Sequence, residues 1–232
     1  MAPFSDKPIH GVVFDLDAGT LLDTEGLSSK ALQMSIEKFG KVFTWEVKQK
    51  MLGLRKESWA PIVIAEFGLE GQLSPDELGT AWEQNLMELS PQVVKCAGAE
   101  SATVLLKDMG IPQAIATSSA KAAVKIKREH HEDLFGRMKC VVTGDDPEVI
   151  EGKPAPDIYL VAAGRIGIKP EECLAFEDAL SGVRAAKAAG MFCVAVPDPR
   201  LDKGPFVEAG ADLVLGSLSE WDASAWRLEA LA

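Results

Sequence analysis

Short β-rich runs alternate with helical patterns along most of this 232-residue chain. Such alternation predicts a parallel sheet, because parallel neighbours are joined by crossovers that are usually helices. Right-handed crossovers then give a doubly wound, Rossmann-like α/β core. The expected strands are Ile9–Phe14, Gln113–Thr117, Met138–Thr143, Glu172–Phe176, Met191–Val196 and Leu213–Leu215. The expected helices of this core are Glu100–Met109, Ala120–Phe135, Asp157–Ile166 and Ser181–Ala189.

The segment between the first two strands is much longer than one crossover requires. Residues 24–94 carry several helical patterns and few strand signals, so we expect a small inserted α-helical cap there. The α/β core would then comprise residues 1–23 and 95–232. The expected helices of the cap are Leu27–Phe39, Trp45–Met51, Lys56–Phe67 and Pro75–Leu89, the last with Ser74 as its N-cap.

Composition narrows the function classes. A net charge of −11 argues against nucleic acid or an anionic membrane as a partner, since both favour a basic face. No apolar run reaches the roughly 18 residues of a membrane span, and no secretory signal pattern opens the chain. The cysteines lack C-x-x-C spacing and are expected to be reduced. We expect a cytoplasmic protein, or an organellar one after transit-peptide removal, and a monomer.

Two carboxylates stand one residue apart after the first apolar run. Asp15 and Asp17 should emerge at the carboxyl end of a strand, where ligands of open α/β sheets bind. Carboxylates this close raise each other's proton affinity unless a cation offsets their charge, so a hard ion such as Mg²⁺ is expected. A pair of solvated loop aspartates is the alternative interpretation of this motif.

Three further strand ends carry suitable groups. Thr117 and Ser118 follow one strand, where hydroxyl and N–H groups can bind phosphate oxygens. Lys153 lies in a proline-braced loop that can aim a cation at an anion. Glu177 and Asp178 form a second acid pair before a helix. Each signal also fits an ordinary helix start, surface lysine or helix cap. Their succession along one parallel sheet favours a single site.

These residue types fit phosphoryl transfer through a covalent aspartyl-phosphate. Asp15 would attack phosphorus, while Asp17 would protonate the leaving alcohol and later deprotonate the attacking water. Lys153 and Thr117 would bind the phosphoryl oxygens. Mg²⁺ would offset the repulsion between carboxylate and phosphate. Its expected ligands are Asp15, Glu177, Asp178 and a backbone carbonyl near Asp17.

The segment Asp15-Leu16-Asp17-Ala18-Gly19-Thr20 resembles the D-x-D-G-T motif of the haloacid-dehalogenase superfamily of phosphatases. Thr117, Lys153 and the pair Glu177-Asp178 are similar to residues of the second, third and fourth motifs of that superfamily. The resemblance covers the whole chain. It implies Mg²⁺-dependent hydrolysis of a small phosphomonoester, with residues 24–94 as a cap that closes over the substrate.

Longer segments narrow the resemblance. The segments from Gly144 to Asp157 and from Val196 to Asp202 are similar to eukaryotic pseudouridine-5′-phosphatase, plant glycerol-3-phosphatase and the FMN-phosphatase half of plant riboflavin kinase. The implied substrate is glycerol 3-phosphate, a sugar or nucleoside monophosphate, or FMN. Arg55 and Lys56 fall where relatives place basic groups near the substrate, although a solvated pair at a helix start is an equal alternative.

Ala18 departs from the family motif, because it is an extra residue between Asp17 and Gly19. A displacement of Asp17 by about 1 Å can lower a rate on the order of a hundredfold. Two other interpretations stay open, and the insertion favours the second. One is a β-phosphoglucomutase-like phosphomutase, which uses the same core. The other is a non-catalytic protein that kept the fold.

Overall fold

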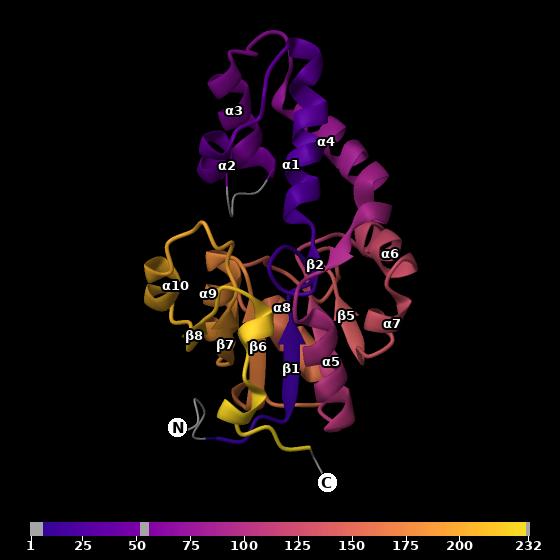
Figure 1. Cartoon of the computed structure of the whole chain (residues 1–232), viewed down its shortest axis with the longest axis vertical. Coiled ribbons are helices and arrows are strands. Elements are labelled where there is room, and N and C mark those ends of the chain that lie inside the picture. The colour runs from indigo at the N-terminus through magenta and orange to yellow at the C-terminus, as the bar shows by residue number, and fades with distance from the viewer. Residues whose placement is uncertain (1–6, 52–55, 231–232) are drawn as a thin grey trace. The chain divides into compact units, whose positions relative to one another are not determined.

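The computed structural model describes residues 7–51 and 56–230. The chain divides into two compact units, which we call the core and the helical unit. The core comprises Met1–Asp23 and Val94–Ala232, and the helical unit comprises Thr24–Val93. Figure 1 labels the elements of both.

In the described residues, the core contains a six-stranded parallel sheet in the order β5-β4-β1-β6-β7-β8. Its strands are β1 (Gly11–Phe14), β4 (Gln113–Ala116), β5 (Cys140–Val142), β6 (Cys173–Glu177), β7 (Phe192–Ala195) and β8 (Leu213–Val214). The central strands are buried on both faces, which is why their sequences are continuous apolar runs. The predicted doubly wound α/β fold is confirmed.

The strand order reverses at β1. The chain adds β4 and β5 on one side of β1, and β6, β7 and β8 on the other. Phe14 pairs with Ile115 of β4 and with Phe176 of β6, so these three strands end within one residue of one another. Ligands of open α/β sheets bind outside the carboxyl ends of strands at such a reversal. The fold therefore favours a site at the ends of β1, β4 and β6.

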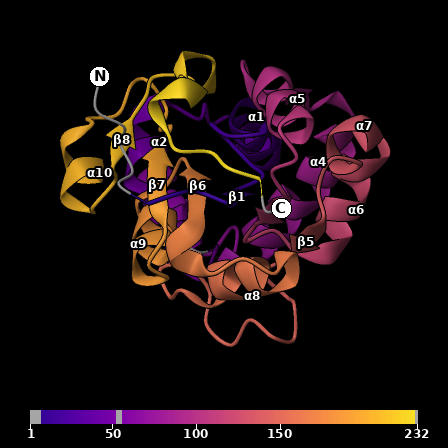
Figure 2. The same cartoon turned by 90° about the horizontal axis from the view of Figure 1, so that it is seen from below.

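Helices cover both faces of this sheet (Figure 2). The helices α8 (Asp157–Ile166) and α9 (Leu180–Ala188) lie on one face, and α5 (Ala99–Asp108) lies on the other. Side chains of successive strand residues alternate between these faces. Val13 packs in the cluster with α8 and α9, whereas Phe14 stacks on Phe176, with ring centroids 4.9 Å apart.

The remaining elements of the core are short. They are the antiparallel pair β2 (Leu22–Asp23) and β3 (Val94–Lys95), the helices α6 (Lys121–Glu129), α7 (Glu132–Phe135) and α10 (Gly204–Glu208), and the 3₁₀ turns η3 (Pro170–Glu172), η4 (Leu218–Glu220) and η5 (Ala223–Ala225). The β2–β3 pair was not predicted, since two-residue strands leave no periodic pattern.

The single predicted helix Ala120–Phe135 is wrong. The structure contains α6 and α7 instead, because His131 adopts φ −138° and ψ 38°, outside the helical region. The other predicted helices and strands of the core are present, with ends that differ by a residue or two.

The helical unit contains α1 (Glu25–Ile36), η1 (Glu37–Phe39), α2 (Trp45–Met51), α3 (Lys56–Phe67), α4 (Pro75–Leu89) and η2 (Ser90–Gln92). Leu32, Trp59 and Leu78 belong to its own apolar cluster. The predicted N-cap is confirmed: Ser74 accepts from the Glu77 backbone N–H, and the Glu77 side chain accepts from the Ser74 backbone N–H.

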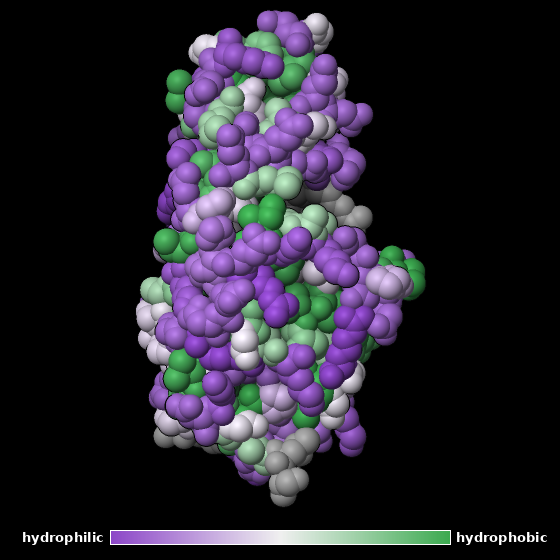
Figure 3. Space-filling view, turned by 90° about the vertical axis from the view of Figure 1, so that its right-hand side faces the viewer, coloured by the Kyte–Doolittle hydropathy of each residue, from purple (hydrophilic) through white to green (hydrophobic). Residues whose placement is uncertain are grey.

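The surface shown in Figure 3 is mostly hydrophilic, with hydrophobic residues in small separate groups. Scattered exposed apolar side chains of this kind are ordinary on protein surfaces. None of the helices in the described part of the chain is long and apolar enough to cross a membrane.

Candidate active site

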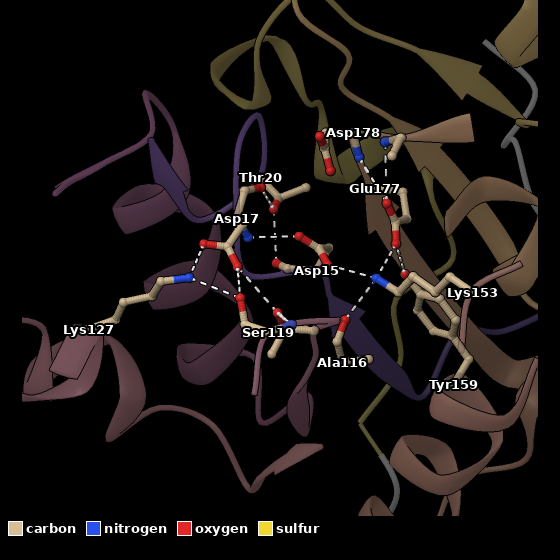
Figure 4. Close-up of polar contacts among 12 residues, drawn as sticks. Asp15, Asp17, Thr20, Ala116, Ser119, Lys127, Lys153, Tyr159, Glu177 and Asp178 are labelled. Carbon is tan, nitrogen blue, oxygen red and sulfur yellow. Dashed lines mark hydrogen bonds and ion pairs between the residues drawn. The ribbon is translucent and has the colours of Figure 1, made fainter. Parts of the chain in front are cut away.

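Asp15 directly follows β1, at the centre of the carboxyl edge of the sheet. Its backbone N–H donates to the Phe176 carbonyl of β6 (2.9 Å), so sheet register continues up to this residue. Its side chain is 9% exposed. Oδ1 accepts from Lys153 Nζ (2.7 Å), and Oδ2 accepts from the Asp17 backbone N–H (2.7 Å) (Figure 4). Two donors therefore orient this carboxylate, which excludes a solvated loop aspartate.

Lys153 reaches the same edge from the loop between β5 and α8. Its Nζ donates to Asp15 Oδ1 (2.7 Å), Glu177 Oε1 (2.5 Å) and the Ala116 carbonyl (3.0 Å). Burial alone lowers the pKa of Lys153, but the charges of Asp15 and Glu177 outweigh it and raise the pKa above its usual value. The ammonium group therefore stays charged while it joins the ends of three strands.

Glu177, the last residue of β6, is almost fully buried. Oε1 accepts from Lys153 Nζ and from the Tyr159 hydroxyl (2.5 Å), and Oε2 accepts from the backbone N–H groups of the next two residues (3.1 and 3.4 Å). Gly182 in α9 makes room, since a Cβ there would lie 1.9 Å from the Glu177 carboxylate carbon. Both oxygens are engaged, and one of them orients Lys153.

The Asp17 carboxylate turns toward α6. Oδ1 accepts from Lys127 Nζ (2.5 Å), and Oδ2 accepts from Ser119 Oγ (2.8 Å) and Thr117 Oγ1 (3.3 Å). Figure 4 shows Lys127 and Lys153 on opposite sides of the two aspartates. Each aspartate of the D-x-D motif therefore has its own lysine.

The extra residue Ala18 lies in the turn that follows. Its φ of +56° is left-handed, which costs an L-residue about 1–2 kcal/mol. Thr20 Oγ1 closes the turn by donating to the Asp17 carbonyl (3.0 Å). Gly19 is needed for close packing, because a Cβ there would lie 2.0 Å from the Val196 carbonyl oxygen. The turn thus absorbs the insertion with local strain.

The structure brings most of the predicted site residues together. Asp15, Asp17, Thr117, Lys153 and Glu177 belong to one continuous network of hydrogen bonds and ion pairs. Asp178 follows Glu177 at the same edge (Figure 4).

Three other predicted residues are not part of this network as the structure describes it. Ser118 is exposed, and its neighbour Ser119 contacts Asp17 instead. Lys56 belongs to the helical unit, where it pairs with Glu83 (2.7 Å). Arg55 lies outside the described residues.

Three contributors were missed from the sequence: Ser119, Lys127 and Tyr159. Lys127 stands in a basic helix typical of a solvated surface, yet it is buried. A signal was available, since Lys127 lies three residues after the buried Val124 and therefore on the same helix face. Tyr159 lies in an apolar helix that indicates only core packing.

The carboxylates give this edge of the sheet a negative electrostatic potential. Burial raises the pKa of Asp15 to about 7; the charge of Lys153 lowers it, and the charges of Glu177 and Asp17 raise it further. The thiol of Cys96 responds to the same field: burial raises its pKa to about 12, and nearby carboxylates add to the rise. A cation at this edge would stabilise the ionised form of Asp15.

The donor set fits Mg²⁺. Its members are carboxylate oxygens, the ligands that this hard ion prefers. Asp15, Asp17 and Glu177 all accept hydrogen bonds from lysines, so each of these acids, together with Asp178, stays a candidate for a direct ligand. Among residues 7–51 and 56–230, no group of three or more His, Cys, Asp or Glu could hold a metal ion. Mg²⁺ is commonly held by one or two carboxylates together with phosphate and water.

A family model described as haloacid dehalogenase-like hydrolase matches residues 9–190. The chain belongs to this family. It is 40% identical to "(DL)-glycerol-3-phosphatase 1, mitochondrial" of Arabidopsis thaliana, over 95% of this chain and 74% of that protein. It is also 40% identical to a probable pseudouridine-5′-phosphatase of Drosophila melanogaster, over 93% of this chain and 92% of that protein.

Among solved structures, the fold of this hydrolase matches a putative β-phosphoglucomutase from Thermotoga maritima. The TM-score is 0.76 and the identity 30%, over 91% of this chain and 96% of the other. The resemblance to the haloacid-dehalogenase superfamily is confirmed. The predicted enzyme class, phosphoric monoester hydrolase, is confirmed through relatives that are named phosphatases.

Proposed function

We propose that this hydrolase is a Mg²⁺-dependent phosphatase that cleaves small phosphomonoesters through an aspartyl-phosphate on Asp15. The main support for this proposal is the buried contact between Asp15 and Lys153, at the point where the strand order reverses. It presents a carboxylate, oriented by two donors, beside an ammonium group that can bind an anion. The phosphatase names of the two relatives support the same chemistry.

In the first step, an Asp15 oxygen forms a bond to phosphorus as the ester P–O bond breaks. Lys153 and the Thr117 hydroxyl hold the phosphoryl oxygens, which places positive charge and hydrogen-bond donors where negative charge develops. Asp17 enters this step in its protonated form and gives that proton to the leaving alkoxide. Its backbone N–H meanwhile keeps Asp15 in place.

In the second step, water attacks the phosphorus of the aspartyl-phosphate. Asp17, now ionised, takes a proton from that water, and Asp15 is released as a carboxylate. Glu177 does not contact the substrate in this scheme, since its oxygens hold Lys153, Tyr159 and two backbone N–H groups. With Asp15 and Asp178 among its candidate ligands, Mg²⁺ would supply charge that offsets the repulsion between carboxylate and phosphate.

We assign substrate selection to the helical unit, as a cap that closes over the bound ester and excludes water. It is inserted in the chain between β2 and β3, a few residues after the loop that carries Asp15 and Asp17. Arg55 and Lys56 are candidates for contact with the substrate. Glycerol 3-phosphate, sugar and nucleoside monophosphates, and FMN form the expected class.

A phosphate-release screen over these esters tests the proposal, with Mg²⁺ and with a chelator. The wild-type protein should release phosphate from at least one ester only when Mg²⁺ is present. Asp15→Asn should abolish this release and keep the fold, because an amide cannot act as the nucleophile. Asp108→Asn, at an exposed residue of α5, is the matched control and should stay active. Full activity in Asp15→Asn would refute the assigned nucleophile.

A phosphomutase is the second candidate, favoured by the likeness to the putative β-phosphoglucomutase. Both reactions share the phosphorylated Asp15 and differ in whether water or a sugar hydroxyl accepts the phosphoryl group. Product analysis with a hexose 1-phosphate separates them: a mutase yields the isomeric sugar phosphate and little free phosphate. A protein that releases phosphate from no ester and forms no isomer would be non-catalytic.

A further inference from the structure

The helix α6 carries several basic side chains, and one of them is buried. Lys121, Lys125 and Arg128 are exposed. Lys127, in contrast, has a side chain that is only 6% exposed. Burial of a lysine is unfavourable unless its charge is paired. The group that pairs with Lys127 therefore indicates the role of this residue.

That partner is the proposed acid–base residue. Lys127 Nζ donates to Asp17 Oδ1 (2.5 Å) and to Ser119 Oγ (3.1 Å), and Ser119 Oγ donates to Asp17 Oδ2 (2.8 Å). The three groups close a ring in which each contacts the other two (Figure 4). Such a ring restrains both the position of the Asp17 carboxylate and the orientation of its plane.

The backbone beside Asp17 shows why the side chain needs this restraint. Ala18 is held in a left-handed conformation, so the turn after Asp17 is strained. The turn that carries Ser119 has a hydrogen bond of its own, from the Ser119 backbone N–H to Thr117 Oγ1 (3.0 Å). The anchor of the Asp17 carboxylate therefore comes from α6 and from the β4–α6 turn.

We propose that Lys127, together with Ser119, is a positioning residue that aims the Asp17 carboxylate at the leaving oxygen. This inference rests on the proposed phosphatase function. Asp15 lies between Lys153 and Lys127, so one lysine faces the phosphoryl oxygens while the other fixes the proton donor on the opposite side. Acid catalysis needs the proton donor within hydrogen-bond reach of the oxygen that departs. A small displacement of the donor is therefore enough to lower the rate.

Leaving-group dependence tests this role. The nitrophenolate of p-nitrophenyl phosphate departs without a proton, whereas the alkoxide of glycerol 3-phosphate, or of another alkyl phosphate found in the screen, requires one. The value of kcat/KM reports the steps up to formation of the aspartyl-phosphate. A misplaced Asp17 should therefore lower kcat/KM for the alkyl ester and spare the aryl ester.

Lys127→Met should lower kcat/KM for the alkyl ester about 30- to 100-fold, and that for p-nitrophenyl phosphate less than about threefold. Lys127→Arg should recover part of the loss. Lys125→Met, on the exposed side of the same helix, is the matched control and should change neither ester. In an Asp17→Asn background, Lys127→Met should add almost no further loss, because both changes remove one function.

Ser119→Ala provides a second variant, since it removes one hydroxyl group and keeps the Lys127 charge. It should show the same selective loss for the alkyl ester, about 3- to 10-fold. Equal losses for both esters in Lys127→Met and Ser119→Ala would overturn the proposal, as would full additivity with Asp17→Asn. Failure of the phosphatase function looks different: the wild-type protein would hydrolyse neither ester, or Asp15→Asn would keep full activity.

Discussion

Lys153→Met should lower the free energy of unfolding far more than the same substitution of a lysine in an exposed ion pair. Methionine nearly matches the length of the lysine side chain but carries no charge. The change leaves the Asp15 and Glu177 side chains, 9% and 1% exposed, without their shared ammonium group. It also removes the donor to the Ala116 carbonyl. Two buried carboxylates would then face each other.

Removal of one partner from a buried ion pair costs about 3–5 kcal/mol, because the remaining charge stays buried and uncompensated. Both ion pairs share the single nitrogen of Lys153, so we count this cost once. Lys187→Met is the matched control. Lys187 pairs with Asp212 at the same 2.7 Å, but these side chains are 30% and 27% exposed, and the expected cost is about 0–1 kcal/mol.

The pH dependence has a definite sign. Between about pH 4 and about pH 7, folded Asp15 holds a proton that an unfolded carboxyl has lost, because burial raises its pKa to about 7. The free energy of unfolding therefore falls as pH rises through this window. Lys153 lowers the Asp15 pKa, so its removal widens the window upward. Lys153→Met should thus lose more stability at about pH 8 than at about pH 5.

Urea unfolding of the metal-free proteins, followed by circular dichroism, measures these differences. The wild type, Lys153→Met and Lys187→Met are compared at both pH values. Equal midpoints for the two variants would refute the argument from burial. If Lys153→Met lost more stability at about pH 5 than at about pH 8, the argument that Lys153 offsets the negative charge of Asp15 would be wrong.

Three further predictions concern the same edge of the sheet. Ala18→Gly should raise the free energy of unfolding by about 0.5–1 kcal/mol, because release of left-handed strain exceeds the entropy that glycine adds to the unfolded chain; a lower thermal midpoint would contradict this. Mg²⁺ should raise the thermal midpoint of the wild type, and more at about pH 8 than at about pH 5, whereas Asp178→Asn should lose most of the rise; an equal rise in both proteins would exclude Asp178 as a ligand. Gly182→Ala should disrupt the core, because its Cβ would lie 1.9 Å from the Glu177 carboxylate carbon. The Cβ of Gly164→Ala in α8 meets no atom within 4 Å, so this control should be neutral or stabilising, and thermal unfolding of both variants measures the difference.

Much of the fold follows from local patterns. The run that ends at Phe14 predicts a buried strand, and the residues after it predict a turn, so local sequence is enough to put Asp15 at a strand end. Lys153 and Asp15 are 138 positions apart, yet their meeting was predictable. The reason is topological, since carboxyl ends of neighbouring parallel strands converge on one edge.

Other features depended on contacts that no local pattern encodes. The sequence could not distinguish Glu177, which binds Lys153 and Tyr159, from its neighbour Asp178. Nor could it show that the predicted helix after Ser119 breaks at His131, where the chain leaves helical geometry.

By itself, the sequence determined the strand and helix pattern, the acidic surface charge and the order of chemical groups at the strand ends, because each depends on residues close in the chain. Only the tertiary structure decided which carboxylate each lysine serves. Lys127 and Asp17 are 110 positions apart. The helix period places Lys127 on the face of Val124, unlike the exposed Lys125, but it does not say which residue Lys127 pairs with. The contact of Lys127 with Asp17 and Ser119 buries one of these lysines while Lys125 stays exposed, and it thereby determines the direction of the Asp17 carboxylate.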